Sequence, residues 1–571
     1  MHVTAVLNRS IEDALRKAVA AVIPDANLDA VQVRPCPDPK FGDYQSSAVM
    51  ALAKERKTNP RQLAADIVAK LDLSASCDKV EIAGPGFLNF RLKPDAIDQA
   101  LQSEHQSAHP FVQPAAHPRT IVIDFSSPNV AKPMHVGHIR STILGDSLAR
   151  TLRLLGHKVI TDNHIGDWGT QFGMLIVAWK RHLDRGALQA DPIAEMERIY
   201  KIVNADPALA EEARQELVKL QRGDAENLAL WQEMITLSQS QFDRIYKRLG
   251  IHFDHTLGES FYNPHLLRIV HQLVEGGLAQ ESEGAQVIFF PGHPQLKEEP
   301  ALIRKSDGAF NYMTTDLATL EHRLNTWQPD EIIYVTDGRQ QLHFRQLFAA
   351  FGRWQPGAKV KLAHVWFGSI LGEDGKPFKT RAGDTVKLAD LLDEAEERAF
   401  TVVSEKNPEL PEPQRREIAR VVGIGAVKYA DLLPNRQTDY VFSWDKMLAL
   451  NGNTAPYLQY AYTRIRSIFR KGEVSEVQGA IKLTESAELS LAKHLLNFGL
   501  VLEAAADEYR PNFLCNYLYE LAGHFTRFYE ACPVLKAEPT VRASRLMVAD
   551  LTGRVLKEGL GVLGIETLEQ M

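Results

Sequence analysis

The spacing of apolar residues predicts a small α+β unit near the start of the chain. A helix begins at Pro60, and Leu63, Ile67 and Leu71 recur at helical spacing on the face that meets a core. Residues 80–92 follow as a strand, a Gly-Pro-Gly turn and a second strand. These elements predict a first folded unit that ends near residue 110.

A second pattern, strand–helix–strand, follows a linker. Three prolines punctuate residues 105–120, which is typical of a connection between domains. Residues 120–125 are apolar and β-branched, a helical pattern then runs to Gly156, and a strand spans residues 158–161. Two strands joined by a helix predict a right-handed parallel crossover of a doubly wound sheet.

The remaining chain is predicted to be largely helical. Residues 179–250 are helical and heavily charged, residues 287–334 return to strands and turns, and helical spacing dominates from Leu388 onward. We therefore predict a multidomain α/β protein. It has a doubly wound, Rossmann-like domain split by a helical insertion, an N-terminal α+β domain and an all-α C-terminal bundle. The predicted boundaries are 1–112 for the N-terminal domain, 119–175 and 301–386 for the two halves of the sheet domain, 176–300 for the insertion, 387–450 for a helical junction and 451–571 for the bundle.

Composition narrows the class of protein. The chain has 571 residues, 45% of them hydrophobic and 24% charged, which excludes a single small binding module and a disordered chain. The formal net charge of −7 means that a polyanion would have to be met by local basic patches. No run approaches the roughly 18 apolar residues of a membrane span. With four scattered cysteines, the chain is predicted to be cytoplasmic.

The loop that follows the strand at 120–125 carries the strongest candidate chemistry. It places His135, Gly137 and His138 at the start of a helix, beside the carboxyl end of a strand. Ligands of open α/β sheets bind at that edge, and a helix N-terminus favours anions. The pattern indicates a phosphate site. A pair of hydrogen-bonded core histidines or a helical metal site would show the same His-x-Gly-His pattern.

Two longer motifs identify a family resemblance. Residues 124–146 contain Ser-Ser-Pro-Asn-x-x-Lys-Pro-x-His-x-Gly-His, and residues 163–173 read Asn-His-Ile-Gly-Asp-Trp-Gly-Thr-Gln-Phe-Gly. Both resemble the arginyl-tRNA synthetase family of class I aminoacyl-tRNA synthetases. The similarity continues through residues 312–316, 339–343 and 451–464, so it covers nearly the whole chain.

The resemblance implies that L-arginine reacts with ATP to give arginyl-adenylate, and that arginine then passes to the terminal adenosine of tRNA(Arg). It implies that ATP binds together with Mg²⁺ and that the enzyme has no prosthetic group. No covalent protein nucleophile is implied, because positioning and charge stabilisation catalyse such phosphoryl chemistry. It also suggests that activation requires bound tRNA and that the enzyme works as a monomer. No membrane partner is expected, because the chain lacks a long apolar run. The residues implicated in ATP binding are His135, Gly137, His138, His343 and Lys379.

The second phosphate-binding loop departs from the class pattern Lys-Met-Ser-Lys-Ser. Residues 375–383 instead carry Lys379 and Arg381 between two glycines. We expect both cations to act in catalysis with the two histidines, and Lys132 to supply the missing charge. A solvated basic turn is the alternative.

The resemblance places a second set of residues around the arginine substrate. A guanidinium group is a permanently charged, planar fork of donors, so its pocket needs carboxylates and neutral acceptors. The residues implicated are Asp124, Tyr312, Asp316 and Gln340 for the side chain, and Ser127 and Asn129 for the backbone region of the amino acid. In isolation, Asp316 would be a helix cap, Tyr312 a core aromatic and Gln340 a surface amide. Such a pocket rejects other amino acids without an editing domain.

Candidate RNA contacts lie at both ends of the chain. Residues 451–571 resemble the anticodon-binding domain of the family, and Thr454 and Pro456 predict a helix with Tyr457, Tyr460 and Arg464 along one face. A helix-bundle core explains the tyrosines nearly as well. The N-terminal domain, with Phe41 and Tyr44, resembles the domain that meets the outer corner of tRNA.

Two other functions use the same features. A catalytically silent RNA-binding paralogue would keep the fold, but it has no chemical reason to retain His135, His138, Lys132 and Asp316. A small-molecule nucleotidyltransferase would share the histidine loop, but it would leave the N-terminal domain and the helical bundle without a task.

Overall fold

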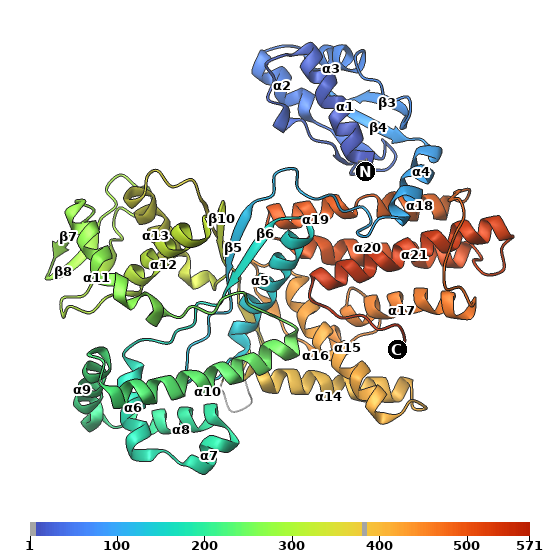
Figure 1. The fold of residues 1–571 in the computed structure, drawn as a ribbon. Coiled ribbons are helices and arrows are strands. Elements are labelled where there is room, and N and C mark those ends of the chain that lie inside the picture. The colour runs from blue at the N-terminus through green and yellow to red at the C-terminus, as the bar shows by residue number, and fades with distance from the viewer. Residues whose placement is uncertain (1–6, 380–384) are drawn as a thin grey trace. The chain divides into compact units, whose positions relative to one another are not determined.

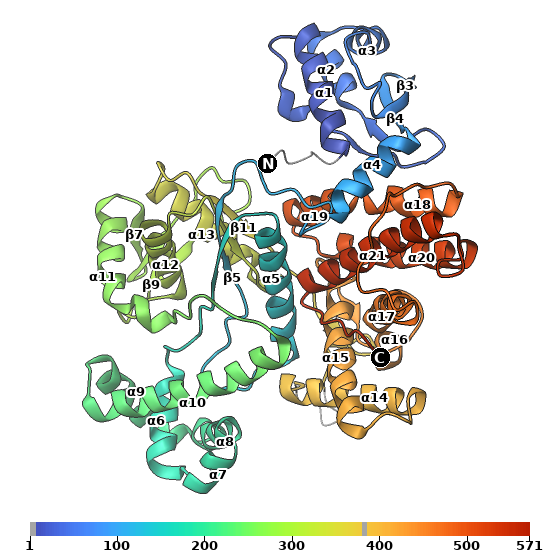
Figure 2. The same ribbon diagram turned by 45° about the vertical axis from the view of Figure 1, so that its right-hand side comes forward.

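A computed structural model gives the fold of residues 7–379 and 385–571. The chain forms two compact units. The first unit contains residues 1–114, 450–561 and 566–571, and the second contains residues 115–449 and 562–565. In Figures 1 and 2 the first unit is coloured blue in its N-terminal part and orange to red in its C-terminal part, and the second runs from light blue through green and yellow to orange.

The second unit is built on a four-stranded parallel sheet. Its order is β11-β10-β5-β6, with β5 at Thr120–Asp124, β6 at Lys158–Asp162, β10 at Glu331–Tyr334 and β11 at Lys361–His364. The apolar residues of β5 are fully buried, as expected of a central parallel strand. Chain order reverses between β5 and β10, so the carboxyl ends of these two strands form the switch point where ligands bind.

The crossover helices confirm the predicted strand–helix–strand unit. Helix α5 (Val136–Leu154) joins β5 to β6, and α13 (Gln341–Trp354) joins β10 to β11. One prediction is wrong, because the stretch 287–334 contains a 16-residue helix, α12 (Tyr312–Trp327). Met313, Leu317 and Leu320 are at most 2% exposed, and their helical spacing decides the structure.

The insertion between β6 and β10 is helical, as predicted for residues 179–250, and ends in a small antiparallel sheet. Its helices are α6 (Gln171–His182), α7 (Arg185–Ala190), α8 (Pro192–Asn204), α9 (Ala210–Gln221), α10 (Ala225–Leu249) and α11 (Glu259–Glu275). The sheet contains β7 (Ala279–Ser282), β8 (Ala285–Ile288) and β9 (Ala301–Arg304), in that order.

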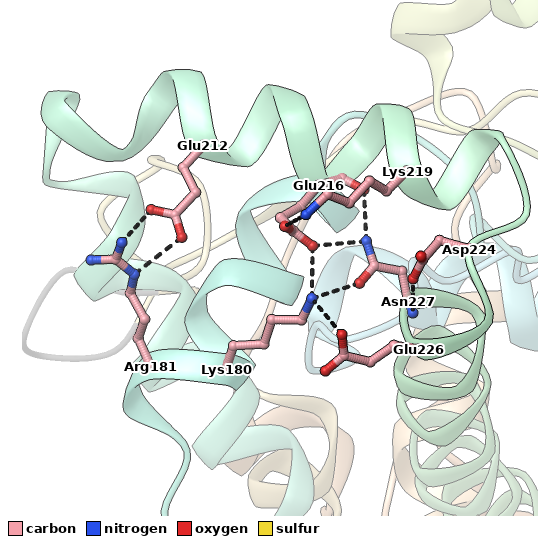
Figure 3. Close-up of polar contacts among 8 residues, drawn as sticks. All are labelled: Lys180, Arg181, Glu212, Glu216, Lys219, Asp224, Glu226 and Asn227. Carbon is pink, nitrogen blue, oxygen red and sulfur yellow. Dashed lines mark hydrogen bonds and ion pairs between the residues drawn. The ribbon is translucent and has the colours of Figure 1, made fainter.

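A polar network ties three of these helices together (Figure 3). Lys180 Nζ on α6 donates to Glu216 Oε2 on α9 and to Asn227 Oδ1 on α10, each over 2.8 Å. Asn227 Nδ2 also donates to Glu216 Oε2 over 2.8 Å, and Lys219 Nζ donates to Glu216 Oε1 over 2.6 Å. Burial opposes ionisation of Glu216, but these donors prevail and lower its pKa to about 2. The network fixes the first turn of α10.

Helices continue after the sheet, as predicted from Leu388 onward. They are α14 (Leu388–Lys406), α15 (Glu412–Leu432) and α16 (Trp444–Met447). The predicted pattern is interrupted by the two-residue strand β13 (Tyr440–Val441), which pairs in parallel with β12 (Ile370–Leu371).

The N-terminal part of the first unit is the predicted α+β domain. Its sheet has the order β1-β2-β4-β3, formed by Arg34–Pro35, Tyr44–Ser46, Phe87–Leu92 and Cys77–Ala83. Its helices are α1 (Leu7–Val22), α2 (Ala48–Arg56), α3 (Pro60–Val68) and α4 (Pro94–His105). Asn59 caps α3 by accepting hydrogen bonds from the amides of Arg61 and Gln62.

The C-terminal part of the first unit is all helical, as predicted. Its helices are α17 (Ala455–Lys471), α18 (Ser486–Leu495), α19 (Phe498–Asp507), α20 (Asn512–Ala531) and α21 (Pro539–Val562). Among the described residues, the segment Ser486–Asp507 is long and apolar enough to cross a membrane by length and composition. It is 56% buried inside the protein and consists of two helices, so it is weak support for a membrane span.

Candidate active site

The loop after β5 has an unusual backbone conformation. Ser126, Ser127 and Ala131 have φ angles of 72°, 49° and 60°, in the left-handed region that residues other than glycine rarely occupy. The Ser126 amide donates to Ser141 Oγ over 2.8 Å, and the Ser127 amide donates to Asn163 Oδ1 over 3.0 Å. Side chains from α5 and from the loop after β6 therefore stabilise this conformation.

The second motif, residues 163–173, packs directly against this loop. The Gly166 amide donates to the Pro128 carbonyl oxygen, and the Val130 amide donates to the Gly166 carbonyl oxygen, each over 3.0 Å. A Cβ atom at Gly166 would lie 2.2 Å from Asn129 Oδ1, so a larger residue would displace the Asn129 side chain from its present position. The two motifs that are separate in the sequence form a single site at the switch point of the sheet.

His135 and His138 begin α5 and cap it. His135 Nδ1 accepts a hydrogen bond from the Gly137 amide over 3.0 Å, and His138 Nδ1 accepts one from the His135 amide over 3.1 Å. The ring centroids are 4.0 Å apart. Because Nδ1 accepts in both rings, the neutral tautomer carries its proton on Nε2. Each histidine therefore keeps an N–H donor for a ligand.

Burial keeps both rings neutral at neutral pH. It lowers the pKa of His135, with further lowering by the charges of Arg339 and Lys132. It also lowers the pKa of His138 to about 3, and His135 contributes to that shift. Two neutral donors can lie side by side and bind phosphate oxygens without repelling each other.

The fold itself gives a reason for glycine at position 137. A Cβ atom at this position would lie 2.8 Å from Cε1 of His135, whose ring folds back over the first turn of α5. Glycine therefore allows the His135 cap to form. Direct approach of a nucleotide to Gly137 stays a prediction.

Helix α12 and the start of α13 bring together three of the predicted arginine and ATP contacts. Tyr312 and Asp316 are four residues apart on one face of α12, and Tyr312 is 60% exposed. His343 Nε2 lies 2.6 Å from Asp316 Oδ2, and the His343 ring centroid is 4.9 Å from that of Tyr312. Gln340 is exposed in the turn before α13. This arrangement offers a carboxylate, a phenol and an amide at the carboxyl edge of the sheet.

Asp124 lies beneath this site in a buried ion network that the sequence did not predict. Its Oδ2 accepts a hydrogen bond from Arg323 Nη2 over 2.6 Å, and its Oδ1 accepts one from Ser127 Oγ over 3.1 Å. Arg323 Nη2 also donates to Asp162 Oδ2 over 2.8 Å, and the guanidinium group lies over the Tyr334 ring at 5.4 Å. Because both Asp124 oxygens already bind protein donors, this residue contributes to the site through its negative charge.

Arg323 could have been found from its spacing, because it follows Asp316 by seven residues on the same helical face. Glu259, at the start of α11, had no comparable signal. Burial raises its pKa to about 7, and the charges of Asp316 and Asp167 contribute although His164 opposes the rise. Glu259 is thus a titratable acid whose environment depends on residues from distant parts of the chain.

The second phosphate-binding loop is only partly described. Lys379 is exposed and lines a cavity of about 580 Å³ together with Phe378 and Arg398. The predicted catalytic residue Arg381 lies outside the described residues. Lys132 is also exposed, close enough to His135 to affect its pKa.

The candidate RNA contacts differ in exposure. Phe41 is 58% exposed, whereas Tyr44 is 2% exposed in the core of its domain. Tyr44 is therefore removed from the set of RNA contacts, because a buried ring cannot meet a ligand. On α17, Tyr460 is 53% exposed, Tyr457 is partly exposed, and the Arg464 guanidinium lies 4.8 Å from the Tyr529 ring centroid.

Comparison with known proteins agrees with this fold and site. Residues 96–444 match the model of class I tRNA synthetase (R) catalytic domains, which defines the protein as a class I aminoacyl-tRNA synthetase. Residues 5–92 match the arginyl-tRNA synthetase N-terminal domain, and residues 458–571 match the DALR anticodon-binding domain. The chain belongs to the arginyl-tRNA synthetase family.

Individual relatives match over their full length. The chain is 46% identical over 580 residues to the arginine–tRNA ligase of Laribacter hongkongensis, and 47% identical over 580 residues to that of Chromobacterium violaceum, with 100% of each chain covered. The solved structure of Thermus thermophilus arginyl-tRNA synthetase matches with a TM-score of 0.85 at 28% identity, and the match covers 99% of this chain and 100% of that one.

Proposed function

We propose that this chain joins L-arginine to tRNA(Arg) in translation. Arginine and ATP, which arrives with Mg²⁺, first form arginyl-adenylate and pyrophosphate, and arginine then passes to the terminal adenosine of the tRNA. The observation that carries the proposal is a single sheet edge that combines two neutral histidine donors with the Asp316–His343 pair. Full-length similarity to arginine–tRNA ligases supports it.

The phosphates of ATP would bind at the start of α5. His135 and His138 supply Nε2–H donors, the helix N-terminus supplies a positive dipole, and Lys132 with Lys379 supplies cations. These groups stabilise negative charge that builds on phosphate oxygens while pyrophosphate leaves. The arginine carboxylate is the nucleophile, so the protein contributes position and electrostatic stabilisation.

Arginine would bind beside Asp316. Its guanidinium group needs a carboxylate and neutral acceptors, and Asp316, Tyr312 and Gln340 present them at the surface end of α12 and the start of α13. Asp124 and Asp162 share a single buried arginine, so their network keeps a net negative charge beneath this pocket. Ser127 and Asn129 are proposed to hold the α-amino end of the substrate.

We assign RNA contacts to both parts of the first unit. Tyr457, Tyr460 and Arg464 on α17 offer aromatic and guanidinium planes that can stack on anticodon bases, and Phe41 offers an exposed ring on the N-terminal domain. We propose domain boundaries that separate the RNA-binding parts of the chain from the catalytic parts: 1–112, 119–175, 176–300, 301–386, 387–450 and 451–571. A cytoplasmic monomer is part of the same proposal.

ATP–pyrophosphate exchange with each of the twenty amino acids tests the function. The assay is run with and without unfractionated tRNA. We expect exchange with arginine alone, and only when tRNA is present. Exchange with a different amino acid would overturn the pocket assignment, and no exchange under any condition would favour a silent RNA-binding protein.

A further inference from the structure

The strained loop after β5 needs support from elsewhere in the fold. Three non-glycine residues, Ser126, Ser127 and Ala131, lie in the left-handed region, and each carries a conformational cost that the surrounding structure has to offset. The same loop leads directly to His135 and His138. The contacts that hold the loop backbone therefore also determine the positions of these two histidines, the proposed phosphate donors.

Helix α10 contacts this loop at both ends of the strained segment. Ser238 Oγ accepts a hydrogen bond from the Ala131 amide over 2.9 Å, and Tyr246 Oη lies 2.8 Å from Ser126 Oγ. Asn163 Nδ2 donates to Tyr246 Oη over 3.1 Å, while its Oδ1 accepts from the Ser127 amide. All three strained residues are thus linked to α10 directly or through Asn163.

These contacts come from one stripe of the helix. Ser238 and Tyr246 are eight residues apart, and Trp231 precedes Ser238 by seven, so the three lie near one face. Trp231 Nε1 donates to the Asp167 carbonyl oxygen over 2.9 Å, in the second motif. Ser238 is 0% exposed and Tyr246 is 5% exposed, so water does not compete for either hydroxyl group.

The helix is itself anchored at both ends. Asn227 in its first turn belongs to the buried network with Lys180 and Glu216 (Figure 3). Near its last turn, Arg248 forms ion pairs of 2.8 Å with Asp393 and Glu396 on α14. A helix fixed at two ends can act as a rigid support for the loop between them.

We propose that Ser238 and Tyr246 are positioning residues for arginine activation. Their hydroxyl groups hold residues 126–131 in the strained conformation that places His135 and His138 for the phosphates of ATP. The two hydroxyl groups are assigned contacts with the loop and none with substrate. The inference rests on the proposed function, because it assigns these residues to the same reaction.

The test uses Ser238→Ala and Tyr246→Phe in the full chain, with tRNA present. Each variant removes one hydroxyl group and little volume, so both should fold. We expect the kcat of arginine-dependent pyrophosphate exchange to fall at least tenfold in each, with KM for ATP and arginine changing less than threefold. Ser238 Oγ also donates to a carbonyl oxygen of its own helix, that of Met234. The matched controls are therefore Thr236→Ala, whose exposed hydroxyl donates to the Gln232 carbonyl oxygen of the same helix, and Tyr200→Phe on α8. The kcat of both controls should stay within twofold of the wild-type value.

A second-site variant separates positioning from a general structural effect. Ala131→Gly removes the cost of a positive φ, since glycine adopts that conformation freely. Exchange by the Ala131→Gly/Ser238→Ala double variant should therefore recover to within threefold of Ala131→Gly alone. Failure of this rescue, or normal kcat in both hydroxyl variants, would overturn the proposal.

Hydrogen–deuterium exchange provides a readout that does not depend on turnover. The peptide covering residues 124–138 should exchange at least tenfold faster in Ser238→Ala and Tyr246→Phe than in Thr236→Ala, and equal rates would overturn the proposal. If the wild-type enzyme itself shows no arginine-dependent pyrophosphate exchange, the proposed function fails. The hydrogen–deuterium exchange measurement still shows whether α10 holds the loop.

Discussion

Replacement of Arg323 by methionine tests the buried charge network most directly. The guanidinium is 0% exposed and pairs with Asp124 over 2.6 Å and with Asp162 over 2.8 Å. Methionine keeps an unbranched side chain but lacks the guanidinium group and its charge, so the variant leaves two buried carboxylates without a cation. Breaking a buried pair in this way costs about 3–5 kcal/mol. That is a large share of the roughly 5–15 kcal/mol that stabilises a typical domain.

The assay must report on this core alone, because unfolding of a protein with several domains does not define a single free energy. Hydrogen exchange of the backbone amides of β5 and β10 meets this need, since both strands lie against the network. A loss of about 3–5 kcal/mol accelerates exchange through opening by about two to four powers of ten. The control Arg268→Met breaks an exposed ion pair with Glu321 on α12 and should accelerate exchange less than tenfold.

A compensating change sharpens the conclusion. Adding Asp162→Asn to Arg323→Met removes one of the two unpaired charges, so we expect it to recover at least half of the lost protection, in logarithmic units. Equal exchange in Arg323→Met and Arg268→Met would refute the reasoning, because it would mean that the buried pairs contribute no more than a surface pair.

Three further predictions follow from the site and its supports. His138→Ala should lower the kcat of pyrophosphate exchange by about 10²–10³, because one preorganised donor is lost; a reduction below fivefold would contradict the assignment. Glu216 has a depressed pKa of about 2, so its stabilisation is present above about pH 4.5 and is lost as the pH falls toward 2. Glu216→Gln should reduce the pH dependence of amide hydrogen exchange in α9 when the protein is titrated with acid. An unchanged pH profile would contradict this role of Glu216. Phe41→Ala should raise KM for tRNA at least threefold while leaving KM for arginine unchanged, whereas Tyr44→Phe should alter neither; a larger effect of Tyr44→Phe on tRNA binding would reverse our assignment.

Some of the site was readable from contiguous residues. The β-branched run before Asp124 and the helical pattern after His135 place the histidine loop at a strand–helix junction, and local hydrogen bonding alone makes His135 a helix cap. The helical spacing of Met313, Leu317 and Leu320 is also visible within a few residues of sequence. The prediction of strands and turns in this stretch overlooked that spacing. In both places the relevant interactions lie within one or two helical turns, where sequence spacing reports directly on geometry.

Other parts depended on residues far apart in the chain. Arg323 is 199 residues from Asp124 and 161 from Asp162, and Tyr246 is 120 residues from Ser126. No periodicity connects such pairs. Only the parallel register of β5 with β6, which sets Asp124 beside Asp162, creates a pair of carboxylates that a single arginine on α12 can neutralise.

The sequence by itself determined the strand–helix–strand unit around the histidine loop, the all-helical end of the chain, the residue types able to bind phosphate and guanidinium, and, through long contiguous motifs, the family. Tertiary structure decided that Asp124 points its oxygens at protein donors, that Tyr44 is buried while Phe41 is exposed, and that α10 supports the strained loop. The reason is physical. Burial and charge pairing are properties of the space around a side chain, and that space is formed by elements that the linear order of the chain leaves far apart.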